Sequence, residues 1–155
     1  MTRADSDAAS GLSPALTLAV AARVLERSLD DMTLPQFRVL ALIATSPERA
    51  NRLASKAAIS RPSLTGLLDG LVGRGWIRRV DVDDDRRGVV LEITATGRDA
   101  LAAADALMRD RIDHLLDAVP PTDRTAALEG LAVLGVALKA HVARTGASTA
   151  ERASA

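Results

Sequence analysis

Residues 60–94 read SRPSLTGLLDGLVGRGWIRRVDVDDDRRGVVLEIT, and the first half of this stretch predicts a helix. Its leucines recur at spacings of three and four residues, which places them on one face: Leu64, Leu67, Leu68 and Leu71. Ser60 precedes this helix with a side-chain oxygen that can cap the first free backbone amides. Pro62 is tolerated in a first turn because its missing N–H would bond nothing there, and Gly75 is expected to end the helix.

Two short β-type runs follow this helix, at residues 76–82 and 88–94, with polar and apolar positions roughly alternating. Between them lies the charged tip DDDRR, residues 83–87. A helix followed at once by a hairpin with a basic tip is typical of a winged helix-turn-helix, a fold that reads DNA. The segments before residue 60 fit this interpretation, because two short helices joined by about three residues are what a helix-turn-helix requires.

The composition of the chain favours a helical protein of one domain. Its 155 residues are 48% hydrophobic, enough for a sizeable core, and only Phe37 and Trp76 are aromatic. No apolar run approaches the roughly 20 residues of a membrane span, and residues 1–11 lack the apolar core of a signal peptide. The absence of cysteine excludes disulfides, thiolate zinc sites and thiol-based redox sensing. We therefore expect a cytoplasmic protein with no membrane partner.

The formal net charge is zero, but the charge is unevenly distributed. Residues 49–79 contain seven basic residues and one acidic residue, Asp69, so this segment carries a charge of +6 and the rest of the chain −6. Such a concentration of positive potential on one module favours binding to nucleic acid, although a solvated basic face is common in any protein.

We call the predicted winged helix-turn-helix, residues 33–98, the reading module. Its first half and the segments that flank it predict further helices. Residues 14–30 form the first, which is either a core helix or part of a subunit interface. A second helix begins at Thr33, which has the capping-box spacing to Gln36, and ends at Ser46. Segment 49–57 has inward-pointing apolar positions. Beyond the hairpin, helices are expected at 97–119 and 122–143, separated by Pro120 and Pro121.

We call the helices expected at 14–30, 97–119 and 122–143 the outer helices, or the outer layer. They carry much apolar surface and no motif of their own, which is typical of a dimerisation layer. We therefore predict an α+β fold, mainly α, in which a winged helix-turn-helix is flanked by N- and C-terminal dimerisation helices. The expected parts are a flexible tail (1–12), an N-terminal dimerisation helix (13–32), a winged helix-turn-helix DNA-binding domain (33–98), C-terminal dimerisation helices (99–144) and a second flexible tail (145–155).

Three runs carry a resemblance to a known family: TLPQFRVLALIA (33–44), LASKAAISRPSLTGLLDGLVGRGWIRR (53–79) and DDDRRGVVLEITATGRDAL (83–101). Together they resemble the MarR (multiple antibiotic resistance regulator) family of winged-helix transcription factors. The resemblance covers residues 33–101 closely, and the flanking helices match the family layout in position only. The combination of the helix-turn-helix, Gly75 before a hydrophobic pair and the Asp-Arg-Arg tip is specific, whereas each piece alone is weak.

This resemblance implies that residues 60–74 form the recognition helix, which lies in the major groove with its first turn nearest the bases. Arg61 can donate twice to a guanine edge, and the hydroxyls at Ser63 and Thr65 can reach a phosphate or a base. The alternative for Ser63 is a second cap. Gly66 and Gly70 each lower the stability of a helix relative to alanine. Their lack of a side chain suits a close approach to DNA or to another helix. The DNA-binding residues expected on this basis are Ser60, Arg61, Pro62, Ser63, Thr65, Gly66, Arg74, Arg86 and Arg87.

The hairpin tip follows the family pattern Asp-x-Arg through Asp85 and Arg87. The resemblance implies that Arg87 enters a narrow minor groove, and that Asp85 pairs with a nearby arginine to hold the wing. The alternative is a solvated run of charges in a loop.

Enzyme functions fit this sequence poorly, because it has no glycine-rich phosphate loop, no cysteine, no tyrosine and only two histidines. His114 has Asp110, Asp113 and Asp117 at helical spacing, so a metal site can be drawn, but a solvated helix face is the commoner explanation. We expect no catalytic residues, no metal and no cofactor.

The resemblance also implies a mode of action. Such a regulator binds a palindromic operator in double-stranded DNA as a homodimer, more often as a repressor. A small, often aromatic or phenolic, ligand held between the dimer layer and the reading module releases it. The sequence identifies no residues that bind such a ligand. The rival hypothesis is a winged-helix protein-interaction module without sequence-specific DNA binding, which zero net charge leaves open.

Overall fold

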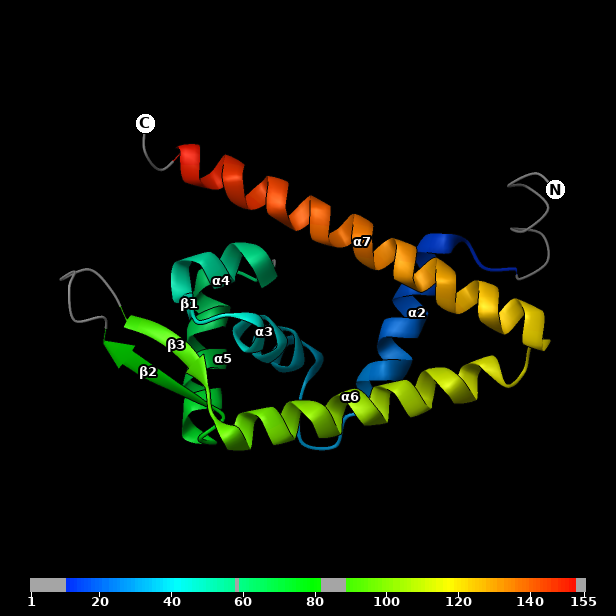
Figure 1. The fold of residues 1–155 in the computed structure, drawn as a ribbon, viewed down its shortest axis with the longest axis horizontal. Helices are drawn as coiled ribbons and strands as arrows, with labels where there is room; N and C mark the ends of the chain where they lie inside the picture. The colour runs from blue at the N-terminus through cyan, green and yellow to red at the C-terminus, as the bar shows by residue number, and fades with distance from the viewer. Residues whose placement is uncertain (1–10, 58, 82–88, 153–155) are drawn as a thin grey trace.

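The computed structural model describes residues 11–57, 59–81 and 89–152 (Figure 1). No helix in these ranges is both long and apolar enough to cross a membrane. The helices are α2 (Pro14–Glu26), α3 (Leu34–Thr45), α4 (Ala50–Ala57), α5 (Arg61–Gly73), α6 (Ala95–Leu116) and α7 (Pro121–Arg152). The strands are β1 (Glu48–Arg49), β2 (Ile77–Asp81) and β3 (Val89–Ile93).

The strands form one antiparallel sheet in the order β1-β3-β2. In the hairpin, Ile77 is opposite Ile93 and Asp81 is opposite Val89, as expected for the two predicted β-type runs. The two-residue strand β1 pairs with the other edge of β3, with Glu48 opposite Leu91. Strand β1 was not predicted, because two residues are too few to show an alternating pattern.

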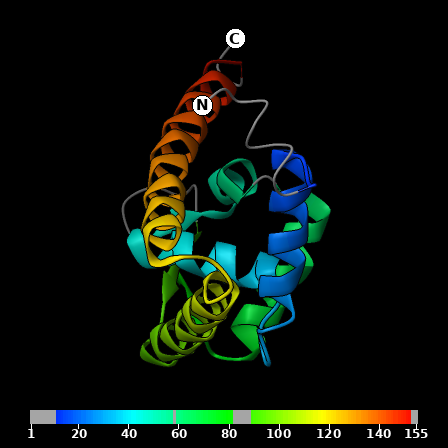
Figure 2. The ribbon, with the colours of Figure 1, turned by 90° about the vertical axis from the view of Figure 1, so that its right-hand side faces the viewer.

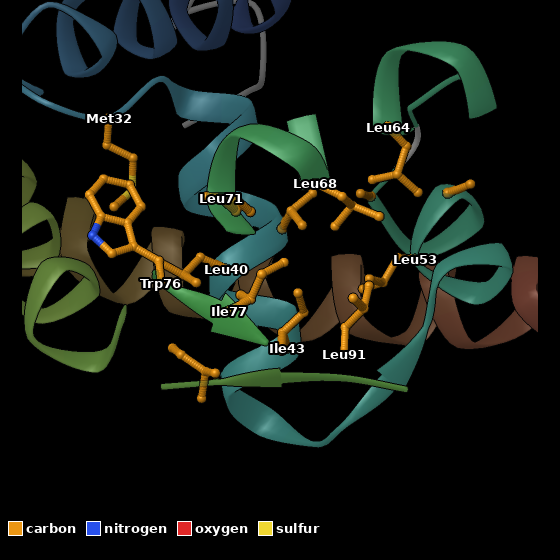
Figure 3. Close-up of a cluster of buried hydrophobic side chains, with 14 of the residues drawn as sticks. Met32, Leu40, Ile43, Leu53, Leu64, Leu68, Leu71, Trp76, Ile77 and Leu91 are labelled. Carbon is orange, nitrogen blue, oxygen red and sulfur yellow. The ribbon is translucent and has the colours of Figure 1, made fainter. Parts of the chain in front are cut away.

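The core of the reading module lies between α3, α4, α5 and the sheet, and Figure 3 shows its side chains converging from these elements. The predicted leucine face of α5 is confirmed: Leu64, Leu68 and Leu71 are buried and Leu67 is partly buried. Trp76 and Ile77 bring the start of β2 into the same cluster. Burying each such side chain contributes about 1.5–3 kcal/mol, so this core fixes how α5 and the hairpin are held together.

The predicted helix starts of the reading module are also confirmed. Thr33 and Gln36 form a capping box at the start of α3, with Gln36 N donating to Thr33 Oγ1 at 3.3 Å and Thr33 N to Gln36 Oε1 at 2.9 Å. Ser60 caps α5. After the C-cap of α5, Gly75 has φ +69°, a conformation that glycine adopts without steric cost, and this turn directs the chain into the sheet.

The outer helices α6 and α7 diverge from the turn that joins them, with α2, α3 and α4 between them (Figure 1). Figure 2 shows α7, in orange and red, running away from α6. Arg124 in the first turns of α7 reaches back to Asp113 at 2.9 Å and to Asp117 at 3.0 Å. Further along, α7 packs beside α4, and α2 contacts α6. The reading module is therefore attached to the outer layer at two places, through α6 and through α7.

Several predicted helix boundaries differ from the structure. Helix α2 ends at Glu26 rather than near residue 30, and α6 begins two residues earlier than predicted, because Thr94 caps it by accepting a hydrogen bond from Gly97 N at 3.0 Å. The predicted end of the last helix near residue 143 was wrong, since α7 continues to Arg152. Its final segment contains no proline and is rich in alanine, the residue with the highest helix propensity.

The outer helices expose much apolar surface. No residue of α2 is buried, and Val133 and Val136 on α7 are 71% and 69% exposed. The large exposed apolar side chains of this layer are Leu12, Leu16, Leu18, Val20, Leu107, Leu115, Val119, Leu128, Leu131, Val133, Val136 and Leu138. Exposed apolar surface on this scale is rare in a soluble monomer and is typical of an interaction face.

Candidate nucleic-acid interface

The first turns of α5 form an exposed surface backed by the core. Leu64 and Leu68 anchor one side of the helix, while the other side faces solvent. At the end of the preceding helix, Arg38 Nη2 donates to the Ala57 carbonyl, which holds α4 against α3. The exposed residues at the start of α5 are those that the sequence predicted to contact DNA: Ser60, Arg61, Pro62, Ser63, Thr65 and Gly66.

The side chains of the first turns differ in whether they are hydrogen-bonded within α5 or available to bind DNA. Ser60 Oγ accepts from Ser63 N at 3.4 Å and donates to Ser63 Oγ at 2.8 Å, so Ser60 is the cap and the Ser63 hydroxyl is its acceptor. Thr65 Oγ1 donates to the Arg61 carbonyl at 3.1 Å. Among the described residues, no hydrogen bond or ion pair engages the Arg61 guanidinium, which leaves its donors available. The open space around the Cα of Gly66 permits a close approach from outside.

Arg74 lies apart from the predicted DNA contacts in the first turns of α5. It is the C-cap of α5, about 20 Å from Arg61 at 1.5 Å per residue. Its Nη1 donates to the Asp31 carbonyl in the α2–α3 connection, and its guanidinium carbon lies 4.7 Å from the centroid of the Trp76 ring. The structure therefore does not bring Arg74 together with the first turn, and it gives this side chain a role in joining α5 to the connection before α3.

The base of the hairpin carries two ion pairs that were not predicted from the sequence. Arg79 Nη2 on β2 donates to Asp69 Oδ1 on α5 at 2.7 Å, and Arg78 donates to Glu92 Oε2 across the sheet at 2.8 and 3.1 Å. A third pair, Lys56 with the buried carboxylate of Glu48, joins α4 to β1. Glu48 and Glu92 lie outside residues 49–79, so these two carboxylates neutralise part of the +6 charge of that segment locally.

The predicted wing-tip residues Asp85, Arg86 and Arg87 lie outside the described residues, so their roles stay predictions.

A pocket lies where the outer layer meets the reading module. Its volume is about 270 Å³, and we call it the Trp76 pocket. Residues from three separate segments line it, which is why the sequence alone did not reveal it. The lining includes Leu29, Asp30, Asp31, Met32, Trp76 and Leu107. A second hollow of about 300 Å³, the Phe37 hollow, is lined by Phe37 and Ala41 of α3 and by Arg98, Leu101 and Asp105 of α6.

The metal site that helical spacing allowed around His114 is not assembled. His114 Nδ1 is hydrogen-bonded to the Asp110 carbonyl at 2.7 Å, and two of the nearby carboxylates, Asp113 and Asp117, bind Arg124 instead. Within the described ranges, no group of three or more histidine or acidic side chains is arranged to hold a metal ion.

An exposed helix backed by a three-stranded sheet and preceded by a short helix defines a winged helix-turn-helix protein. The comparisons with known proteins agree: the model of the MarR family matches residues 30–88. The chain is 30% identical over 110 residues to YfiV, an uncharacterized HTH-type transcriptional regulator of Bacillus subtilis, covering 70% of this chain and 69% of that protein. It is also 30% identical over 105 residues to the multiple antibiotic resistance protein MarR of Escherichia coli, covering 65% and 71%.

Solved structures match over more of the chain. The apo form of MarR from E. coli aligns with a TM-score of 0.66 at 26% identity, covering 77% of this chain and 94% of that one. The transcriptional repressor CouR, bound to a 23-mer DNA duplex, aligns with a TM-score of 0.67 at 27% identity, covering 87% and 98%. This chain belongs to the MarR family and is a DNA-binding transcriptional regulator. Its relatives are transcriptional regulators rather than enzymes.

Proposed function

We propose that this protein is a homodimeric repressor that binds an inverted-repeat operator and leaves it when a small ligand binds. The observation that carries this proposal is the exposed first turn of α5, where the Arg61 guanidinium is not engaged by the described residues. CouR, which shares the fold at 27% identity, is a transcriptional repressor with a structure on DNA. A chromosomal operator also implies a cytoplasmic protein.

The support for a dimer is the apolar surface of α2, α6 and α7, which this chain leaves exposed. Obligate dimers bury more than about 2,000 Å² of mostly apolar surface, and we expect the interface here to exceed that area. Light scattering on the full chain at micromolar concentration should give the mass of two copies. A monomer under those conditions would contradict the dimer.

Two-fold symmetry determines the form of the operator. In a dimer of this kind, the two copies of α5 enter successive major grooves on one side of the duplex, about 34 Å apart. The half-sites are then inverted relative to each other, with centres about one helical turn apart. Selection from a random DNA library with the full chain should therefore return an inverted repeat.

Release by a ligand is supported by the position of the Trp76 pocket. It lies between α6, the α2–α3 connection and the start of β2, so an occupant contacts both the outer layer and the reading module. Its volume of about 270 Å³ suits a small molecule of one or two rings, the size of the aromatic or phenolic effectors that the family resemblance implies.

The experiment that tests the proposal is a titration of the selected duplex and a scrambled duplex at several salt concentrations, read by fluorescence anisotropy. We expect tighter binding to the selected duplex and a steep loss with salt, because each neutralised phosphate contributes a slope of about −0.9 in log K against log[salt]. Equal and weak binding to both duplexes would instead favour the rival function, a protein-interaction module.

A further inference from the structure

The Trp76 pocket has apolar walls and an acidic rim. Leu29, Met32 and Leu107 form its walls together with Trp76, and Figure 3 shows Met32 lying beside the indole ring. Both charged side chains that line it, Asp30 and Asp31, are acidic and exposed. No ion pair engages either carboxylate among the residues that the structure describes. The cation beside the pocket is Arg74, whose guanidinium lies over the Trp76 ring and donates to the Asp31 backbone carbonyl rather than to either carboxylate.

This charge distribution selects among ligands. A ligand with an aromatic body and a positive charge places its body against the walls and its charge beside the two carboxylates. An aromatic carboxylate or phenolate of the same size meets two like charges at the rim, an interaction that a partly exposed site weakens but does not cancel. We propose that the Trp76 pocket binds a small aromatic cation, such as a ring bearing a quaternary ammonium group. This inference rests on the proposed release of DNA by a ligand.

Arg74 connects this pocket to the recognition helix α5, and so couples ligand binding to DNA binding. Its guanidinium lies over the Trp76 ring and donates to the Asp31 carbonyl, so it uses two residues that line the pocket. A ligand cation is attracted to the same aromatic ring and the same acidic segment. It therefore competes with Arg74, and its binding detaches the C-terminal end of α5 from the α2–α3 connection. The recognition helix is then held less firmly in the orientation that binds DNA.

Binding can be followed directly, because Trp76 is the only tryptophan of the chain. The full-length protein is titrated with benzyltrimethylammonium, with uncharged benzyl alcohol and with salicylate, and the fluorescence of Trp76 is recorded. We expect saturable binding of benzyltrimethylammonium, roughly tenfold tighter than that of salicylate. Asp30→Asn with Asp31→Asn should remove most of this preference. The control is Asp105→Asn, which removes one negative charge at the Phe37 hollow and should leave the preference intact.

The second measurement is the affinity for the selected duplex, with and without each compound. We expect benzyltrimethylammonium to weaken DNA binding of the wild-type protein, and Arg74→Ala to weaken it without any compound. Equal or tighter binding of salicylate, or a preference that survives in the Asp30→Asn, Asp31→Asn variant, would overturn the inference. If salicylate alone released DNA, the proposed function would stand while this inference would fall. If the protein bound no selected duplex, the proposed function itself would fail, whereas the fluorescence titration would still decide the charge preference.

Discussion

Asp69 Oδ1 on α5 and Arg79 Nη2 on β2 are 2.7 Å apart, so an ion pair links the recognition helix to the first strand of the wing. The two side chains are 58% and 52% exposed, and a pair of this kind contributes about 0.2–1 kcal/mol to stability. The buried side chains of Leu71 and Ile77 therefore do most to hold helix and strand together. The pair has a second effect: it places a negative charge on the exposed side of α5 and engages a basic residue near it.

The first prediction concerns this charge. We expect Asp69→Asn to increase the affinity for DNA by a few-fold, because it removes a negative charge from the recognition helix and frees Arg79 to reach a phosphate. The slope of log K against log[salt] should steepen by about 0.9 if one phosphate contact is gained. The free energy of unfolding should fall by less than about 1 kcal/mol.

Glu92→Gln is the matched control for Asp69→Asn. It removes the same charge and frees Arg78, but Arg78 and Arg79 are neighbours on one strand and point to opposite faces of the sheet. Glu92→Gln should therefore change DNA affinity less than Asp69→Asn. Equal gains from both variants would indicate a general effect of net charge, with no special position for Asp69.

The second prediction concerns the close contact between α6 and the start of β2. A Cβ added at Gly97 would lie 2.0 Å from the Trp76 carbonyl oxygen and 2.8 Å from its carbon, which backbone atoms cannot accommodate without moving. Gly97→Ala should therefore lower the free energy of unfolding by about 1–3 kcal/mol in urea denaturation, although alanine normally stabilises a helix. Gly73→Ala is the control, since its Cβ meets nothing within 4 Å, and it should be neutral or stabilising.

Much of this architecture could be predicted because its determinants are local. The leucine spacing of α5, the capping box at Thr33 and the turn at Gly75 each depend on residues within a few positions of one another. The features that were missed depend on residues distant in sequence. The hydrogen bond from Arg74 to the Asp31 carbonyl was missed, because the two residues are 43 positions apart in the chain. The Trp76 pocket was missed for the same reason.

The third prediction tests one of these local determinants. Thr33→Ala removes the hydroxyl that accepts from Gln36 N, and the free energy of unfolding should fall by about 1 kcal/mol. Thr45→Ala is the control at the other end of α3. The Thr45 hydroxyl donates to the Leu42 carbonyl within the helix, and alanine has the higher helix propensity there, so this variant should be neutral or slightly stabilising. Equal losses at both ends would argue against a specific capping effect.

The last prediction concerns sequence reading by Arg61. Ser60 and Ser63 are hydrogen-bonded to each other and Thr65 to its own helix, so Arg61 is the one long donor in the exposed first turn. If each Arg61 donates twice to a guanine, Arg61→Ala should cost about 1–3 kcal/mol per half-site and relax the preference at one base pair. If Arg61 contacts only phosphate, all sequences should weaken alike and the preference should stay intact.

A binding-site selection with the Arg61→Ala protein distinguishes these two outcomes, and we expect the base contact. Ser63→Ala is the matched variant, because it removes the acceptor of the Ser60 hydroxyl from the same turn without removing a charge. That change should leave the salt slope unaltered and the selected guanine in place. A consensus unchanged by Arg61→Ala, together with a salt slope shallower by about 0.9, would assign Arg61 to the DNA backbone and leave base reading to another part of the interface.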